Sequence, residues 1–390
     1  MKNIDKKTLK LGIIATLICA VIFLWFTFRP GLIGTFHWHT FIFFAWKMLL
    51  ITAILPVIFL VINIIKTNKA TIILSKVFSI FSMSLWIIIY LGLMILPRLP
   101  INNDGLQLLS KKEPLPVSSN ASEKGLLAHY AFASDPHWGS SRSNAEARTQ
   151  ILKQIDSRRY DAFFCLGDIS EVGMVPMIMQ SAVNDMRDNL KNTKSVVIPG
   201  NHDFIVNGFP AFKQAFMQKG DKKYFRMDNG TIHMIFLFMV WDDAEFSKAQ
   251  EKWLIKQLEE IPQEETVIVI SHCYVTGSGY FDSAANRNWG DIPSVIATIC
   301  PILEKYNVDL HLGGHNHFFE FLEKDDVDYL ILGGMGGALD KDLIYTSPYS
   351  KWLDNDNFGW VDMKVFKDYL ELTIYKYDGT VLNSKKIATY

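Results

Sequence analysis

The stretch SVVIPGNHD, residues 195–203, decides the fold class because it joins a strand pattern directly to three polar side chains. Its apolar, β-branched run is typical of a buried strand, and a Pro-Gly pair then turns the chain. Asn201, His202 and Asp203 follow at once. An amide, an imidazole and a carboxylate at the carboxyl end of a strand predict a ligand site, because open α/β sheets bind their ligands there.

From about Leu126 onward, the chain alternates between apolar strand patterns, polar loops and helical patterns. Expected strands lie at 129–134, 161–166, 195–198, 231–239, 266–270, 308–312 and 329–333, and expected helices at about 144–157, 175–191, 247–260 and 292–306. Near the C-terminus, alternating strands flank an Asp378-Gly379 turn, which is typical of antiparallel pairing. The pattern predicts an α/β domain of mixed sheets covered by helices.

Polar side chains recur after the other expected strands in the same way. The set comprises Asp135 and His137 in SDPHW, Asp168 in LGDIS, Asn201, His202 and Asp203 in PGNHD, His272 in ISHC, and His315 and His317 in GGHNH. If His202 is not counted as a ligand, two aspartates, one asparagine and four histidines offer oxygen and nitrogen ligands without a thiolate. This mixture suits two divalent cations such as Mn, Fe or Zn better than a lone Ca or Mg, and Asp168 is the candidate bridge between them. Capping and turn residues are the alternative reading, but they do not explain the histidines.

The series DPH, GD, GNHD, H and GHNH resembles the calcineurin-like metallophosphoesterases from about Leu126 to the C-terminus. The resemblance implies a sandwich of two mixed β-sheets flanked by helices, with a dinuclear metal centre. It implies that one metal is held by Asp135, His137, Asp168 and His317, and the other by Asp168, Asn201, His272 and His315. It also implies that His202 gives a proton to the leaving group and that Asp203 orients its ring.

The same resemblance implies hydrolysis of a phosphomonoester or phosphodiester by a metal-bridging hydroxide. The segments around His272 and His315 look like the purple acid phosphatases and cyclic nucleotide phosphodiesterases. The purple enzymes have tyrosine three residues after the bridging aspartate, where this chain has Glu171, and lipid A precursor hydrolases have arginine in place of His202. A catalytically silent binding protein with the same fold is the alternative, which an incomplete ligand set would favour.

The first hundred residues are much more apolar than the rest and predict three transmembrane helices. Uncharged runs at about 11–28, 48–65 and 77–96 each have the roughly 18 to 20 residues needed to cross a bilayer. We therefore expect a membrane domain at 1–98, a linker at 99–125 and the catalytic domain at 126–390. A signal peptide is the alternative for the first run, but no clear small-x-small cleavage site follows it.

Lysines set the expected orientation of these spans. Lys2, Lys6, Lys7 and Lys10 precede the first span and Lys66, Lys69 and Lys76 join the second to the third, while the other side carries only Arg29, Lys47 and Arg98. The positive-inside rule then predicts a cytoplasmic N-terminus and an extracytoplasmic catalytic domain, periplasmic or extracellular. A transport unit is a further hypothesis, but the spans contain no carboxylate or histidine.

Partners follow from the same features. One span is enough for an anchor, and three can form a groove for a lipid tail, so a phospholipid or polyprenyl phosphate is one candidate substrate. The net charge of -1, without a basic stripe, argues against nucleic acid. The four cysteines lie in apolar contexts and are expected to be buried thiols rather than disulfides.

Overall fold

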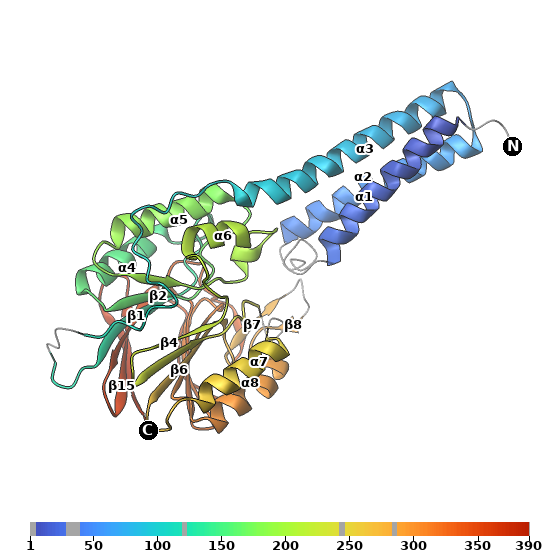
Figure 1. The fold of residues 1–390 in the computed structure, drawn as a ribbon. Helices are drawn as coiled ribbons and strands as arrows, with labels where there is room; N and C mark the ends of the chain where they lie inside the picture. Colours follow the sequence, from blue (N-terminus) through green and yellow to red (C-terminus); the bar gives the residue numbers. More distant parts are fainter. Residues whose placement is uncertain (1–4, 29–39, 119–122, 242–245, 283–286, 390) are drawn as a thin grey trace.

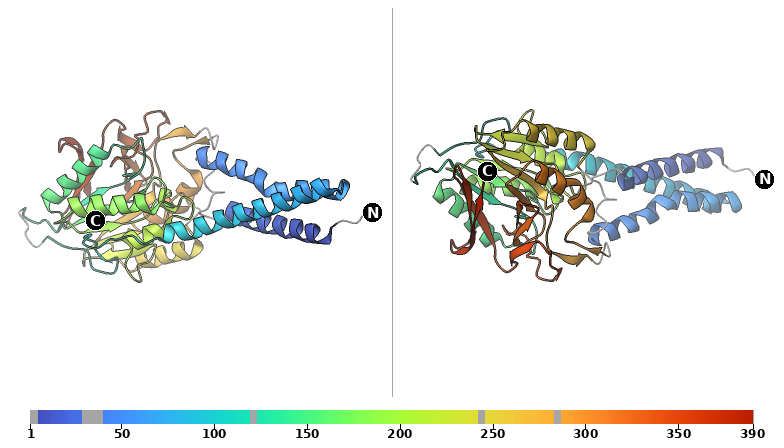
Figure 2. Two further views of the ribbon diagram at one scale, coloured as in Figure 1. Left: turned by 90° about the horizontal axis from the view of Figure 1, so that it is seen from above. Right: turned by 90° about the horizontal axis from the view of Figure 1, so that it is seen from below.

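In the computed structural model, which describes residues 5–28, 40–118, 123–241, 246–282 and 287–389, a three-helix bundle leads into a domain of two packed sheets (Figure 1). The bundle extends away from the domain in every view (Figure 2). Lys2 and Arg29 lie outside the described residues.

The bundle contains the three long apolar helices that the sequence predicts. They are α1 (Lys6–Phe28), α2 (Thr40–Ile65) and α3 (Lys69–Ile95), and the 3-10 turn η2 (Leu96–Arg98) continues α3. Each helix is long and apolar enough to cross a membrane. Each also begins before its uncharged run: α1 and α3 each begin with a lysine, and α2 begins with the mostly apolar segment TFIFFAWK. At α3, Asn68 and Thr71 cap the first turn reciprocally.

The first sheet has six strands in the order β16-β15-β14-β1-β2-β3. Their bounds are β1 (Ala128–Ala133), β2 (Ala162–Cys165), β3 (Ser195–Val197), β14 (Gly359–Val365), β15 (Tyr369–Lys376) and β16 (Val381–Ala388). β1, β2 and β3 run parallel, whereas β14, β15 and β16 pair antiparallel as the C-terminal pattern predicts.

The second sheet has seven strands in the order β13-β10-β11-β9-β6-β5-β4. Their bounds are β4 (Phe225–Asp228), β5 (Ile232–Phe236), β6 (Thr266–Cys273), β9 (Leu310–Gly314), β10 (Phe319–Lys324), β11 (Val327–Leu332) and β13 (Ser350–Asp354). A small third sheet contains β7 (Gly279–Asp282), β8 (Arg287–Asn288) and β12 (Leu343–Tyr345).

Helices cover the outer faces of both large sheets (Figure 1). The helices α4 (Ala145–Arg158), α5 (Pro176–Asn189) and α6 (Phe209–Phe216) lie on the first sheet, and α7 (Lys248–Glu259) and α8 (Pro293–Lys305) on the second. Between the sheets, Phe164 stacks on Phe132 at 4.9 Å and on Phe236 of the other sheet at 5.8 Å. Burial of these rings holds the two sheets together.

The predicted α/β sandwich is confirmed, and each expected strand and helix is present to within a few residues. Sequence patterns missed several short elements, including β4, α6 and β10. A segment of four to eight residues contains too few repeats to separate a helical from a strand period.

The segment after η2, expected to be a linker, packs against the domain in its described part. Leu109 and Leu115 are buried. The Ser195 N–H donates to the Gln107 carbonyl at 2.8 Å, and the Leu109 N–H donates to the Ser195 carbonyl at 2.9 Å. These bonds cover the edge of the first sheet beside β3.

Candidate metal centre

The residues predicted to bind metal lie together where the two large sheets meet. Asp135 and His137 follow β1, Asp168 follows β2, Asn201 follows β3, His272 is in β6, and His315 and His317 follow β9. β1, β2 and β3 pair in parallel with one another, as do β6 and β9, so the carboxyl ends within each set lie at the same edge of its sheet.

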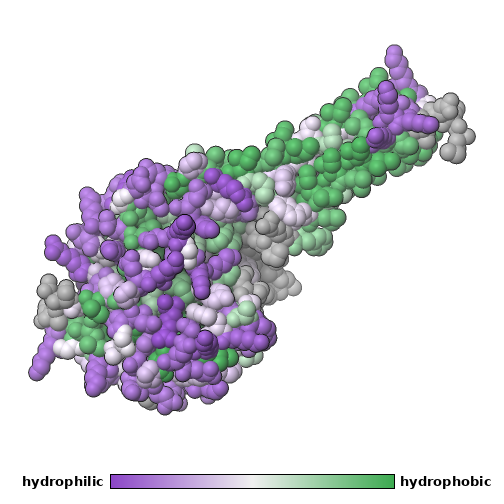
Figure 3. Space-filling model, in the orientation of Figure 1, coloured by the Kyte–Doolittle hydropathy of each residue, from purple (hydrophilic) through white to green (hydrophobic). Residues whose placement is uncertain are grey.

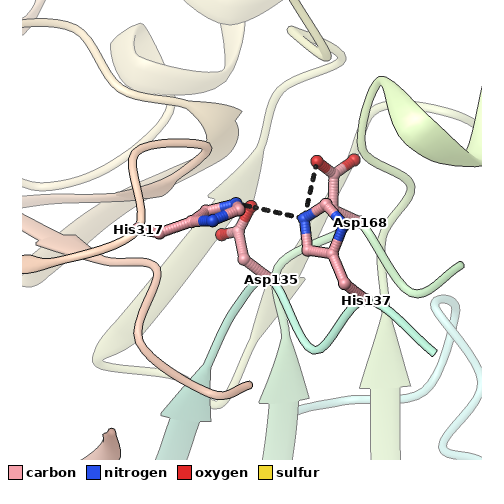
Figure 4. A group of neighbouring side chains, drawn as sticks. All are labelled: Asp135, His137, Asp168 and His317. Atoms are coloured by element: carbon pink, nitrogen blue, oxygen red, sulfur yellow. Dashed lines mark ion pairs between the residues drawn. The ribbon is translucent and has the colours of Figure 1, made fainter. Parts of the chain in front are cut away.

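A first group of side chains comprises Asp135, His137, Asp168 and His317, which point toward one another (Figure 4). His137 Nε2 lies 3.4 Å from Asp168 Oδ2 and 3.9 Å from Asp135 Oδ1. His317 Nε2 lies 3.4 Å from Asp135 Oδ1. One potential ligand atom from each residue falls within 4.8 Å of the others, so the four residues could hold a single ion.

A second group comprises Asp168, His272 and His315, with Asn201 between them. Asn201 Oδ1 is 3.0 Å from both His272 Nε2 and His315 Nδ1. His272 Nε2 is 3.5 Å from Asp168 Oδ1. Asp168 is therefore common to both groups, with a different oxygen facing each.

Hydrogen bonds on the far ring nitrogens set the histidine tautomers. Nδ1 of His317 donates to the Ala338 carbonyl at 2.7 Å, and Nδ1 of His272 donates to the Leu166 carbonyl at 2.8 Å. Nδ1 of His137 donates to the Glu171 carboxylate at 2.8 Å. With Nδ1 protonated, each neutral ring keeps the lone pair of Nε2 for a ligand within its group.

The backbone is strained at this site. Asp135, His137, Asp168 and His315 have φ values of 62°, 47°, 51° and 72°, in the left-handed region that such residues rarely occupy. Each such residue costs about 1 kcal/mol or more, and such strain is characteristic of functional sites. Gly167 has φ 110°, and a Cβ there would lie 2.5 Å from His272 Nδ1, so this close approach requires glycine.

The buried polar atoms of the first group fit a cation. Burial opposes ionisation of Asp135, yet the nearby imidazoles of His137 and His317 hold its pKa well below the usual range. Burial also opposes ionisation of Asp168, and the charges of His272 and His202 lower its pKa. Among the described residues, Asp135 Oδ1 and His137 Nε2 have no hydrogen-bond partner. Buried polar atoms without partners are costly, so a divalent cation fits this donor set.

His202 lies beside the two groups and lines the pocket above them. Its backbone N–H donates to Asp168 Oδ1 at 2.8 Å, and its Nδ1 donates to the Glu171 carbonyl at 2.8 Å. Burial lowers the pKa of this imidazole, while the charge of Asp168 acts in the opposite direction. The ring is thus fixed through Nδ1 by a main-chain acceptor.

Asp203 is buried and surrounded by hydrogen-bond donors. Its carboxylate accepts hydrogen bonds from the backbone N–H groups of Ile169, Ser170 and Gly200 at 3.2, 2.9 and 3.0 Å, and from the Ser170 hydroxyl at 3.1 Å. Burial raises its pKa to about 6, and the charge of Asp168 adds to this effect. The Glu171 carbonyl, and not Asp203, accepts the hydrogen bond from Nδ1 of His202. Asp203 instead joins the loops that follow β2 and β3 through its hydrogen bonds to their main-chain N–H groups.

The pocket also contains residues that the motifs did not identify. Trp241, Tyr280, Trp289 and Asp340 line it together with the ligand groups. The rings of Trp241 and Trp289 approach His315 edge to face, with centroids 5.4 and 5.7 Å away. Tyr280 and Trp289 belong to the Gly-rich segment after His272, whose glycine and aromatic content was the available signal.

Part of the chain matches a known protein family. A model of calcineurin-like phosphoesterases matches residues 128–319, which include every residue of both groups. No curated protein matches the sequence.

Solved structures resemble the phosphoesterase domain in fold. They include the purple acid phosphatase PPD1 from yellow lupin, Lupinus luteus (TM-score 0.58, 16% identity, 67% of this chain and 53% of that chain). A dimetal phosphatase from Danio rerio has a TM-score of 0.50 and 12% identity, covering 68% of this chain and 100% of that one. GAP50, the anchor in the inner membrane complex of Plasmodium, has a TM-score of 0.51 and 16% identity, covering 67% and 90%. This chain thus spans about half the length of the lupin protein.

Asp203→Ala should lower the free energy of unfolding by about 1–3 kcal/mol, because buried N–H donors would lose their acceptor. Asp203→Asn keeps one carbonyl oxygen and should lose less. Urea denaturation in detergent, with a chelator present so that metal binding contributes nothing, measures both variants. Unchanged stability of Asp203→Ala together with slower turnover would instead support the expected role beside His202.

Proposed function

We propose that this protein is a membrane-anchored, dinuclear-metal phosphoesterase that hydrolyses a phosphomonoester or phosphodiester outside the cytoplasm. The observation that carries the proposal is the pair of ligand groups sharing Asp168, inside a calcineurin-like phosphoesterase domain. Complete ligand groups support an enzyme over the catalytically silent binding protein.

In this proposal, one metal is held by Asp135, His137, Asp168 and His317, and the other by Asp168, Asn201, His272 and His315. The donor set is nitrogen and oxygen only, which suits Mn, Fe or Zn. Two such cations would neutralise phosphate oxygens and make hydroxide available near neutral pH for in-line attack on phosphorus. The buried, unpartnered atoms of Asp135 and His137 support this assignment.

His202 is the proposed proton donor to the leaving-group oxygen. Its Nδ1 is held by the Glu171 carbonyl, so a proton on Nε2 is the one available for transfer to substrate in the pocket. Glu171 also holds His137, and the same residue therefore fixes a proposed ligand and the proposed acid. Asp203 contributes by tying together the two loops that carry Asp168 and His202.

Variants of ligands and of the proposed acid should behave differently. Asp168→Asn and His272→Ala should lose bound metal and activity together, because each removes a ligand. His202→Ala should keep its metal content but slow turnover by about 100-fold or more, most strongly for substrates with poor leaving groups. Metal analysis and kinetics on aryl and alkyl phosphates measure these effects. Loss of metal in His202→Ala as complete as in His272→Ala would contradict the division between ligand and acid.

The extracytoplasmic location is a proposal supported by the distribution of charge along the bundle. Hydrophilic residues cluster at the tip far from the catalytic domain, and an apolar surface separates the two (Figure 3). Lys76 and Asp5 form a 3.1 Å ion pair near this tip. The positive-inside rule places the lysine-rich tip in the cytoplasm and the phosphoesterase domain on the other side.

Cysteine labelling tests this topology. The native cysteines are buried, so background labelling is low. Glu113→Cys, at an exposed position of the segment after η2, should react with a membrane-impermeant maleimide in intact cells, whereas Ala70→Cys, at the start of α3, should react only after lysis. Labelling of Ala70→Cys alone in intact cells would reverse the topology.

A lipid-linked phosphate, such as a phospholipid or polyprenyl phosphate, is the second candidate for the substrate. It is favoured because the loop after His202 packs on the bundle, which places the pocket near the end of the proposed membrane spans. Trp241 and Trp289 add an apolar wall to the pocket.

A substrate panel in detergent distinguishes lipid from soluble substrates. If the substrate is lipid-linked, kcat/KM for a lipid phosphate should exceed that for a soluble nucleotide by about tenfold or more, since uniform binding of the tail lowers KM. Asp168→Asn is the control for contaminating phosphatases. Equal kcat/KM on both classes, or preference for the nucleotide, would reject the lipid substrate.

A further inference from the structure

We propose that the three-helix bundle positions the loop that carries His202, with Ile205 and Asn207 as the positioning residues. The bundle is then a part of the catalytic apparatus as well as an anchor. This inference rests on the proposed role of His202 as proton donor.

Apolar side chains of the His202 loop are packed into the end of the bundle. Ile205 is fully buried and Val206 is 7% exposed, and both belong to one cluster with Phe26 of α1, Trp46 of α2 and Leu93 of α3. If the bundle were only an anchor, the covalent link from α3 into the domain would be enough, and the loop would need no contact with the helices. Because the cluster includes side chains of α1 and α2 as well as α3, the assembled bundle and this loop share one apolar core.

A polar contact fixes the backbone of the same loop. The Asn207 side-chain amide donates to the Leu93 carbonyl at 2.9 Å. Val206 and Asn207 have φ values of 52° and 67°. Such a conformation is a genuine outlier for a β-branched residue and persists only where surroundings enforce it. The bundle end provides those surroundings, because it contacts Ile205 before Val206 and Asn207 after it.

The neighbouring loop after β2 is held in the same way. Val172 and Met174 pack against the cluster, and the Gly173 N–H donates to the His202 carbonyl at 3.0 Å. Glu171, one residue before Val172, accepts from Nδ1 of His202. The bundle therefore contacts the chain just after His202 and the residues next to the acceptor that fixes its ring.

The bundle end is also fastened to the domain, so that its position is defined relative to the loops. Asn103 donates to the carbonyls of Gln214 and Ala215 at 3.1 and 3.0 Å, and Asn102 exchanges two 2.8 Å hydrogen bonds with Gln180. η2 lies against α5 and α6. A loop clamped between a fastened bundle and the domain holds its imidazole at a set distance from the leaving group.

The test compares Ile205→Ala with Phe78→Ala in the full-length protein. Phe78 of α3 stacks on Phe59 of α2 at 4.0 Å, so its loss weakens the bundle without touching the His202 loop. Ile205→Ala should lower kcat for an alkyl phosphate by about 10- to 100-fold, because misplacement of a catalytic group by about 1 Å has such an effect. Its kcat for p-nitrophenyl phosphate, whose leaving group needs no proton, should stay within about twofold. Metal content should be unchanged, and Phe78→Ala should affect none of these quantities.

Conservative replacements separate positioning from folding. Ile205→Val should recover most of the alkyl phosphate turnover, and Asn207→Gly, which keeps the left-handed backbone accessible, should show a smaller version of the Ile205→Ala pattern. If Ile205→Ala does not fold, Asn207→Gly provides the test. Equal losses on both substrates with loss of metal, or no change on either, would overturn the inference. If His202→Ala itself lacks the leaving-group effect, the proposed acid fails instead.

Discussion

The position of Asp168 between two groups of ligand atoms is the constraint on which the site depends. One carboxylate can face both groups only if strands of the first sheet and strands of the second end at the same place. The distance between the sheets must therefore be fixed by the core. Phe132, Phe164 and Phe236 stack across that core, and their packing sets the separation at which His137 and His272 approach opposite oxygens of Asp168.

Such a site is costly in the absence of a cation. Asp135 and Asp168 are buried, and both lie in the left-handed region of the backbone, as does His137 between them. The surrounding structure holds these residues in their left-handed conformations. They follow parallel strands, and main-chain hydrogen bonds fix the loops around them. Asp203 is part of this support, since its carboxylate accepts the backbone N–H groups that flank Asp168 and Asn201. Strain at the centre and regular structure around it are consistent with a site organised for ligands before they bind.

The bundle and the two-sheet domain meet at the loops that follow β2 and β3. Ile205 and Val206 follow His202 by a few residues and are buried against the end of the bundle. If His202 acts as proposed, this contact couples the geometry of the site to the packing of the three helices. The same contact gives a physical reason for three helices where one would anchor the chain.

The sequence by itself determined the fold class, the three apolar helices and the identity of the candidate ligands. Those features are encoded locally: a strand period, an uncharged run, or a short motif such as GNHD or GHNH. Only the tertiary structure decided that Glu171 holds both His137 and His202, that Asp203 binds the loop backbone, and that Trp241 and Trp289 wall the pocket. It also brought Asn207 to Leu93, more than a hundred residues earlier in the chain. Contacts of this kind depend on how distant segments pack, and no local period or spacing in the sequence records that packing.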